Sequence, residues 1–118
     1  MKLEKKKCMM IFIEDTDTWK GEKLYTAIVR LLHKRGLDGA TALSGITGFG
    51  AAGQIHRRGL FGVSDERPII IVAIDSEAKI MEGIEVVSPM VKEGLICTYD
   101  TEVFTPDTDV GKTENEPH

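Results

Sequence analysis

The chain carries the apolar sequence PIIIVAI at residues 68–74, and this stretch decides how its fold is interpreted. Its β-branched residues favour a β-strand. Polar residues do not alternate with the apolar ones, so the pattern predicts a strand that is covered on both faces. The sequence KCMMIFIE at residues 7–14 has the same character and predicts a second strand of this kind.

A first helix is predicted between these two strands. Apolar residues recur at helical spacing from Leu24 to Arg35. Gly36 suits the position just after a helix, where the backbone often adopts a positive φ. The polar residues 15–21 predict a connection in which Asp17 or Thr18 caps the helix.

A second helix is predicted after residues 68–74. Asp75 and Ser76 are typical capping residues, and an apolar stripe continues from Glu77 to about Val87. Because Pro89 disturbs the stripe, the residues up to 92 are expected to form a turn or a short extra helix.

Two further strands, at residues 40–46 and 95–104, complete the predicted fold. The order β-α-β-β-α-β is the ferredoxin-like arrangement, an α+β fold whose antiparallel sheet has the strand order 4-1-3-2. We expect a single domain over residues 1–104. Residues 105–118 are polar and contain two prolines, so a disordered tail is expected there.

The predicted sheet has one face without a cover. Both helices lie on one side of it, so alternate residues of 8–13 and 69–74 form an apolar surface on the other side. An exposed apolar surface of this size is uncommon on a soluble monomer. We therefore expect this face to pack against further copies of the chain in a closed, symmetric oligomer.

Composition excludes several classes of function. A chain of 118 residues with a net charge of −4 lacks the basic surface of a nucleic-acid-binding protein. Its two cysteines, Cys8 and Cys97, lie in apolar runs and are expected to be buried free thiols. No apolar run reaches the ~18 residues that span a bilayer, and no signal peptide is recognisable. We expect a cytoplasmic protein.

The candidate site lies in residues 43–67. Six glycines occur there, at positions 45, 48, 50, 53, 59 and 62, together with His56, Arg57 and Arg58. Because glycine has no side chain, it leaves the backbone N–H groups accessible to a ligand. Arginine supplies a positive charge and paired hydrogen-bond donors. The composition indicates a loop that binds an anion, and it fits equally well a mobile hairpin loop that arginines keep soluble.

Other nucleotide-binding motifs fit this loop poorly. GFGAAG at 48–53 matches the dinucleotide fingerprint G-x-G-x-x-G, but no apolar helical stripe follows it. Gly45 and Gly50 have the spacing of a P-loop, but Ala51 and Ala52 stand where lysine and serine or threonine belong.

Support for catalysis or metal binding is weak. The histidines and cysteines are scattered, so no metal site is predicted. Ser44 and Ser64 lack a placed pair of histidine and acid that would make either a nucleophile. Glu14 and Asp15 end a strand, where solvated acids are common.

Two aromatic residues within the loop and two residues of a later turn complete the candidate site. We expect Phe49 and Phe61 to fold back onto its base, the alternative being that they stack on a base or dock a partner. Lys92 and Gly94 precede the last strand and would form a second phosphate-binding turn if the loop of a neighbouring copy reached them.

Several short sequences carry a resemblance to a known family. The most specific are GITGFG at 45–50 and IH at 55–56, and the others are IE at 13–14, KGEKLY at 20–25, GAT at 39–41, Leu60, RPI at 67–69 and EGLI at 93–96. From about Met9 to Val103, the chain resembles the uncharacterised PII-like proteins classed as domain of unknown function one-ninety. These are related in fold to the PII nitrogen-regulatory signalling proteins.

The resemblance implies a ferredoxin-like fold assembled as a PII-like homotrimer. In PII proteins, adenine nucleotides bind between subunits, where the base of the long loop meets the turn before the last strand. The corresponding ligand-binding candidates are Gly45, Thr47, Gly48, Phe49, Gly50, His56, Arg57, Arg58, Lys92 and Gly94. That turn departs from the PII pattern, because only Lys92 and Gly94 remain of its glycines and phosphate-binding lysine.

Together these observations predict a non-catalytic sensor that binds ADP, ATP or AMP, or a similar small anion, at the subunit interfaces. Binding is expected to order residues 45–67, which then regulate a partner such as a membrane transporter or an enzyme. No cofactor is required, and no nucleic acid is expected as a partner. Two alternatives stay open: an enzyme that uses Glu14, Asp15 or His56 in the same cleft, and a trimeric docking protein.

Overall fold

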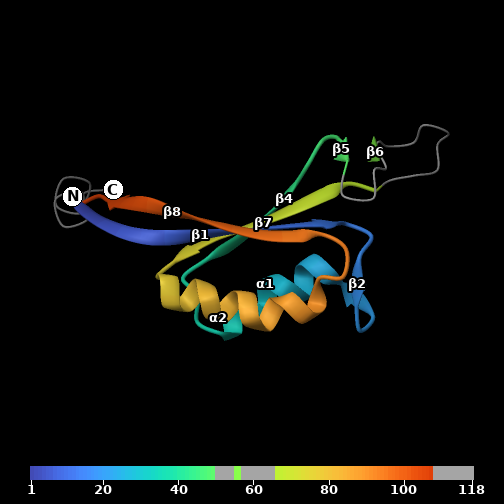
Figure 1. The fold of residues 1–118 in the computed structure, drawn as a ribbon, viewed down its shortest axis with the longest axis horizontal. Helices are drawn as coiled ribbons and strands as arrows, with labels where there is room; N and C mark the ends of the chain where they lie inside the picture. Colours follow the sequence, from blue (N-terminus) through green and yellow to red (C-terminus); the bar gives the residue numbers. More distant parts are fainter. Residues whose placement is uncertain (50–54, 57–65, 108–118) are drawn as a thin grey trace, which may run out of the picture.

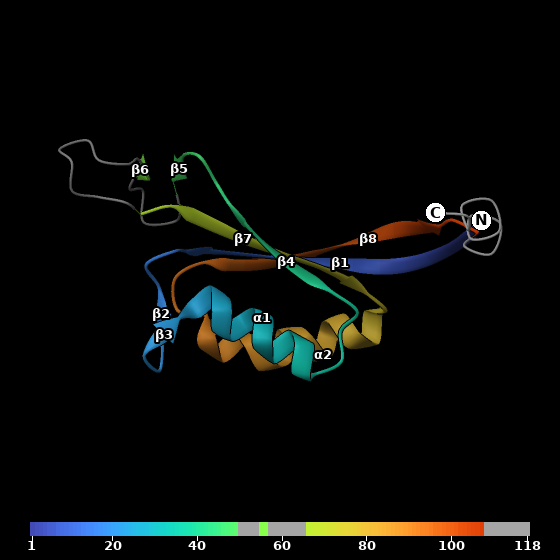
Figure 2. The same ribbon diagram turned by 180° about the vertical axis from the view of Figure 1, so that it is seen from behind.

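The computed structural model describes residues 1–49, 55–56 and 66–107, with the backbone alone for residues 55 and 56. Its main sheet is antiparallel and four-stranded, and two helices cover one of its faces (Figures 1 and 2). The elements of this layer pair are β1 (Lys2–Glu14), α1 (Leu24–Lys34), β4 (Ala40–Ser44), β7 (Pro68–Asp75), α2 (Glu77–Val87) and β8 (Leu95–Thr105). The strand order β4-β7-β1-β8 confirms the predicted ferredoxin-like fold.

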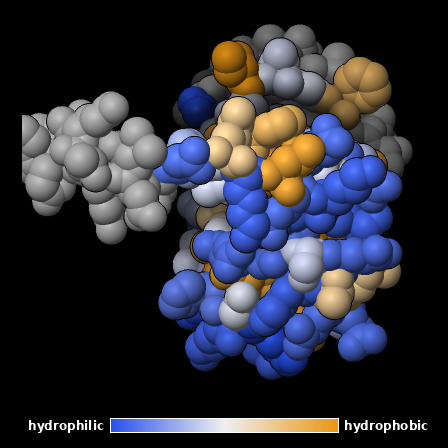
Figure 3. Space-filling model, turned by 90° about the vertical axis from the view of Figure 1, so that its left-hand side faces the viewer, coloured by the Kyte–Doolittle hydropathy of each residue, from blue (hydrophilic) through white to orange (hydrophobic). Residues whose placement is uncertain are grey.

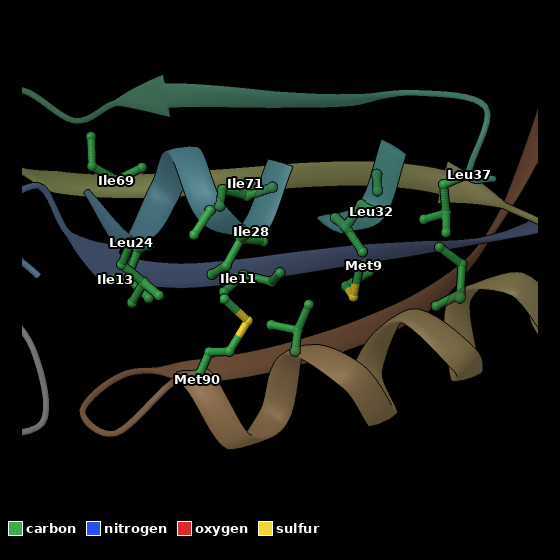
Figure 4. Packing of buried hydrophobic residues seen from close by; sticks show 14 residues of the cluster. Met9, Ile11, Ile13, Leu24, Ile28, Leu32, Leu37, Ile69, Ile71 and Met90 are labelled. Carbon is green, nitrogen blue, oxygen red and sulfur yellow. The ribbon is translucent and has the colours of Figure 1, made fainter. Parts of the chain in front are cut away.

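The hydrophobic core lies between the sheet and the helices (Figure 4). Ile11 of β1 stands opposite Ile71 of β7 and Ile96 of β8, so this row of side chains points to the helices. From helix α1, Ile28 and Leu32 fill the same layer, and both are fully buried. The apolar stripes seen in the sequence are therefore the surfaces that meet in the core.

The other face of the sheet has no helix over it. Figure 3 shows hydrophobic side chains gathered on the upper, sheet side of the molecule, whereas the lower, helical side is mainly hydrophilic. The strand register puts ten apolar or aromatic residues on this open face, namely Leu43, Ile70, Val72, Ile74, Cys8, Met10, Phe12, Leu95, Cys97 and Tyr99. In a single chain, the two central strands are thus covered on one face only.

The two cysteines differ in burial. Cys8 is buried, as predicted, but Cys97 is exposed because it lies on the open face of the edge strand β8. The prediction of a buried thiol at Cys97 is therefore wrong for the single chain. None of the helices in the described part of the chain is long and apolar enough to cross a membrane.

Helix α1 ends as predicted but begins differently. Gly36 has a φ of +84°, its N–H donates to His33, and the Leu37 N–H donates to Leu32, which is a Schellman motif. At the start, no side chain caps the helix, so the predicted cap by Asp17 or Thr18 is wrong. Instead, the Leu24 N–H donates to the backbone carbonyl of Asp17 at 2.9 Å.

That backbone contact arises from a small hairpin that the sequence did not predict. Strands β2 (Thr18–Trp19) and β3 (Glu22–Lys23) are joined by Lys20 and Gly21, which have φ angles of +50° and +87°. Two positive φ angles make the tight turn that joins twisted strands. Arg30 of α1 donates to the Glu22 carboxylate and lowers the pKa of that group.

Helix α2 has the predicted cap. The Ser76 hydroxyl accepts a hydrogen bond from the Lys79 N–H at 3.3 Å. The buried Asp75 carboxylate accepts from the N–H groups of Ser76 and Asp38, at 2.7 and 2.9 Å, and so fixes the entry to the helix. After α2 comes the short helix η1 (Ser88–Met90), so of the two expected alternatives, a turn or a short extra helix, the structure has the helix.

Strand β1 is longer than predicted, because it begins at Lys2 and not at Lys7. Pairing with β7 starts only at Lys7, opposite Asp75, whereas pairing with β8 continues outward to Lys2, opposite Thr105. Residues 2–7 of β1 and 100–105 of β8 therefore form an extension, here called the arm, which is two-stranded beyond Lys7. It reaches beyond the helices and carries both ends of the described chain (Figure 1).

Candidate functional site

The candidate residues gather at the end of the sheet opposite the arm. There β1 and β4 end, β7 and β8 begin, and the loop of residues 45–67 departs and returns (Figure 1). Because the strands are antiparallel, residues far apart in sequence reach this edge together. The three described parts of the site are the two ends of the loop and the turn before β8.

Gly45 fixes the first end of the loop. Its N–H donates to the carbonyl of Pro68 at 2.7 Å, which extends the pairing of β4 with β7 by one residue. A Cβ at Gly45 would lie 2.6 Å from Cγ of the Pro68 ring. This glycine is therefore needed so that the backbone can pass the proline.

The next residues form a short hairpin. Strand β5 (Gly48–Phe49) pairs with β6 (Ile55–His56), with Gly48 opposite His56. A strand at residues 55–56 rules out the helix that the dinucleotide-binding fingerprint requires at this place.

Two large apolar side chains at this end of the loop are exposed. Phe49 has 75% of its surface exposed, so the prediction that it folds back onto the loop base is wrong. Ile46, which sequence reasoning did not single out, is 90% exposed. Both can therefore contact a ligand or a partner. Phe61 lies outside the described residues.

The returning end of the loop is tied to the end of β1. The Asp15 N–H donates to the Arg67 carbonyl at 2.9 Å, and the Arg67 N–H donates to the Asp15 carboxylate at 3.3 Å. The Thr16 hydroxyl also donates to the Glu66 carboxylate at 3.4 Å. Asp15 thus holds the base of the loop in place, which is a structural role.

The turn before β8 is set by Gly94. Its φ is +156°, and a Cβ on it would stand 2.2 Å from the carbonyl oxygen of Phe12. The neighbouring Lys92 is exposed, so its ammonium group is available to an anion. Gly94 lets the turn lie directly against β1.

A single chain does not bring these parts into one pocket. Gly45 follows β4 and Gly94 precedes β8, and these strands are the two opposite edges of the sheet. With a strand spacing of ~4.8 Å, the two edges are about 14 Å apart. Gly50, Arg57 and Arg58 lie outside the described residues, and only the backbone of His56 is described.

The part of the chain that the structure describes contains no set of side chains that could hold a metal ion. No group of three or more His, Cys, Asp or Glu side chains there is arranged to hold an ion. The described part of the site is therefore made of glycine backbone, two exposed apolar side chains and one exposed lysine. Such a set can bind an anionic ligand that carries an apolar ring.

Sequence comparison finds clear relatives. The family DUF190, described as Uncharacterized ACR, COG1993, matches residues 6–103. A UPF0166 protein of Aquifex aeolicus is 32% identical over 104 residues, which cover 88% of this chain and 98% of that protein. A UPF0166 protein of Methanocaldococcus jannaschii is 31% identical over 105 residues, covering 88% and 96% of the two chains.

Structure comparison finds the same fold in a PII-like protein. CPII from Thiomonas intermedia K12, a nitrogen regulatory PII-like protein, is similar with a TM-score of 0.67 and 23% sequence identity. The similarity covers 89% of this chain and 93% of that chain, whose structure was solved bound to ADP, AMP and bicarbonate. The ferredoxin-like fold found here is therefore a PII-like fold.

Proposed function

We propose that this chain, which belongs to the DUF190 family, is a non-catalytic sensor that binds an adenine nucleotide between the subunits of a homotrimer. The observation that carries the proposal is the open, apolar face of the sheet. Soluble proteins rarely leave such a surface in water. Packing of three open faces around one axis removes the surface from water and places sheet edges side by side.

The position of the two half-sites supports the same assembly. In a head-to-tail ring, the β8 edge of one copy comes beside the β4 edge of the next. The turn of Lys92 and Gly94 then faces the loop base of Gly45 and Gly48 in the neighbouring copy. Two halves that are about 14 Å apart within one chain become one cleft between two chains.

The chemistry of that cleft suits an adenine nucleotide. In the proposed site, Lys92, Arg57 and Arg58 hold the phosphates together with backbone N–H groups from Thr47 to Gly50. Ile46 and Phe49 offer apolar surface to the base. ADP and AMP in the structure of CPII support this ligand class, and ATP shares its chemistry.

In this proposal, the loop of residues 45–67 regulates a partner protein. A nucleotide that contacts both ends of residues 45–67 restricts the loop, and a cytoplasmic partner such as a membrane transporter or an enzyme reads the restricted form. Ordering a backbone costs roughly 1–2 kcal/mol per residue, so a few phosphate contacts can fix only part of the loop.

Titration calorimetry with ADP, ATP and AMP tests the proposal. We expect saturable heat with at least one of them, and about tenfold weaker binding in Lys92→Ala, because a charged hydrogen bond to phosphate is lost. Lys34→Ala is the matched control, since Lys34 is an exposed lysine at the far end of α1. Absence of heat with all three nucleotides at millimolar concentration would remove the nucleotide from the account.

A further inference from the structure

The arm has two backbone edges that no strand of the described chain covers. Along residues 2–6, β1 pairs with β8 on one side only, because β7 ends opposite Lys7. Among the described residues, no strand pairs with the outer edge of β8 along Leu95–Thr105, since β8 is the last strand of the sheet. Free edges present rows of unpaired N–H and C=O groups to other strands.

The arm also exposes apolar side chains. Leu3 stands opposite Phe104 near the tip, and they are 53% and 57% exposed. A two-stranded ribbon without further cover is only marginally stable in water. A third strand beside the arm would cover part of this pair and satisfy one of the two free edges.

The two strands of the arm carry opposite charge. Between residues 2 and 6, the β1 strand has three lysines and one acid, namely Lys2, Glu4, Lys5 and Lys6. The β8 strand has two acids there and no basic residue, namely Asp100 and Glu102. Two β1 edges repel one another, two β8 edges do the same, and a β1 edge attracts a β8 edge.

At the root of the arm, the acid is accessible, whereas the side chains of Lys6 and Lys7 are only 22% and 18% exposed. Lys7 donates to the Asp100 carboxylate at 2.9 Å, yet that aspartate side chain is 88% exposed. A hollow opens beside it and is lined by Lys5, Lys6, Glu77 and Glu102 among others. The exposed charges of the arm that a neighbouring chain can reach are thus Lys2, Lys5, Asp100 and Glu102.

We propose that the arm is a docking element for a second copy of this chain, in which the free β1 edge at residues 2–6 pairs with the outer β8 edge of the next copy. The free edge of β1 lies on the side of the sheet where β7 and β4 are found. The pairing therefore runs head to tail in the same direction as the proposed trimer, and three such contacts close a ring. It shares the trimer with the proposed function but requires no nucleotide.

Isotope-coded cross-linking tests the pairing. Chains labelled with ¹⁴N and ¹⁵N are unfolded in urea, refolded together without nucleotide, and treated with a carbodiimide that joins lysines to carboxylates. We expect cross-links between residues 2–6 and residues 100–102 that connect a light chain to a heavy one. If every cross-link between these segments joins chains of one isotope, or if the refolded protein is monomeric, the proposal is wrong.

A charge reversal sharpens the test. In Lys5→Glu, the mixed-isotope cross-links through Lys2 and Lys6 should fall several-fold, because the β1 edge loses its positive charge. The matched reversal Lys34→Glu on α1 should leave them unchanged. Equal yields in both variants would contradict charge-guided pairing. If Lys5→Glu fails to fold, the wild-type cross-links alone decide. Nucleotide calorimetry remains a separate test, so either proposal can fail without the other.

Discussion

Gly94 packs directly against the backbone of Phe12, and no other residue type fits there. A Cβ would stand 2.2 Å from the Phe12 carbonyl oxygen, at a φ of +156°. This contact holds the turn before β8 on the end of β1, and with it Lys92. The closeness of two backbones, rather than contact with a ligand, explains the glycine.

Gly94→Ala should therefore destabilise the protein by about 2 kcal/mol or more, because the turn must move away from β1. Gly39→Ala is the control, since a Cβ at Gly39 meets nothing within 4 Å, and we expect a change below about 1 kcal/mol. Urea unfolding of both variants measures the difference. Equal stabilities would show that the turn does not depend on the contact with Phe12.

The cap of α2 gives a second stability prediction. Ser76→Ala removes the hydroxyl that accepts from the Lys79 N–H, and the free energy of unfolding should fall by about 1 kcal/mol. Thr18→Ala is the comparison, because Thr18 is exposed and caps no helix. Its effect should stay within about 0.5 kcal/mol. Thermal or urea unfolding checks both, and a larger loss in Thr18→Ala would contradict the helix start described here.

The pair of Arg30 and Glu22 predicts an acid dependence of stability. Hydrogen bonding to the arginine lowers the pKa of Glu22 below its ordinary value of 4.5. In the unfolded chain, Glu22 binds a proton more readily than in the folded chain. The stability that the pair contributes is therefore fully present above pH 4.5 and is lost as the pH falls through the pKa of Glu22 in the folded state. The effect is small, because both side chains face solvent.

Glu22→Gln should remove that part of the acid dependence. Urea midpoints of the variant and the wild type should differ at about pH 6, and the difference should shrink as the pH falls below 4.5. A constant difference between the two proteins over this range would mean that the ion pair contributes nothing that depends on protonation of Glu22.

The open face gives the prediction that bears most directly on assembly. Ile74→Glu puts a charge on that face and should dissociate the oligomer. Met81→Glu makes the same kind of change on α2, where Met81 is exposed on the helical layer, and should leave the oligomer intact. Size-exclusion chromatography with light scattering measures both masses. Dissociation by both variants, or by neither, would speak against a role of the open face.

The fold could be predicted where its signals are local. The apolar run at 68–74, Gly36 and Ser76 each act on their own neighbourhood, and each was found where expected. The first residues of β1 could not be found in this way. They are mainly charged and lie outside the hydrophobic core. Pairing with β8, about a hundred residues away in sequence, makes them a strand.

The unpredicted hairpin before α1 had a weaker signal. Its strands are two residues long, and the turn places Lys20, a residue with a Cβ, at a positive φ, which is uncommon. Only the following Gly21 indicated a turn. Because of this hairpin, the first N–H of α1 donates to a backbone carbonyl and not to a capping side chain.

The candidate site could be predicted only in part, because its pieces come from different strands. Gly45 and Gly94 were named as candidates from the sequence, and the structure gives each a close backbone contact within the chain. Their part in ligand binding stays a prediction. Ile46 was missed, since an isolated isoleucine in a glycine-rich segment resembles the end of a strand. Its exposure became visible only when β4 was seen to end at Ser44.

Sedimentation equilibrium of the wild-type protein at micromolar concentration tests the central claim most directly, because the open face, the cleft and the arm all depend on further copies of the chain. We expect a single species, the trimer, with three times the 13.0 kDa mass of one chain. A folded species of 13.0 kDa at that concentration would contradict it.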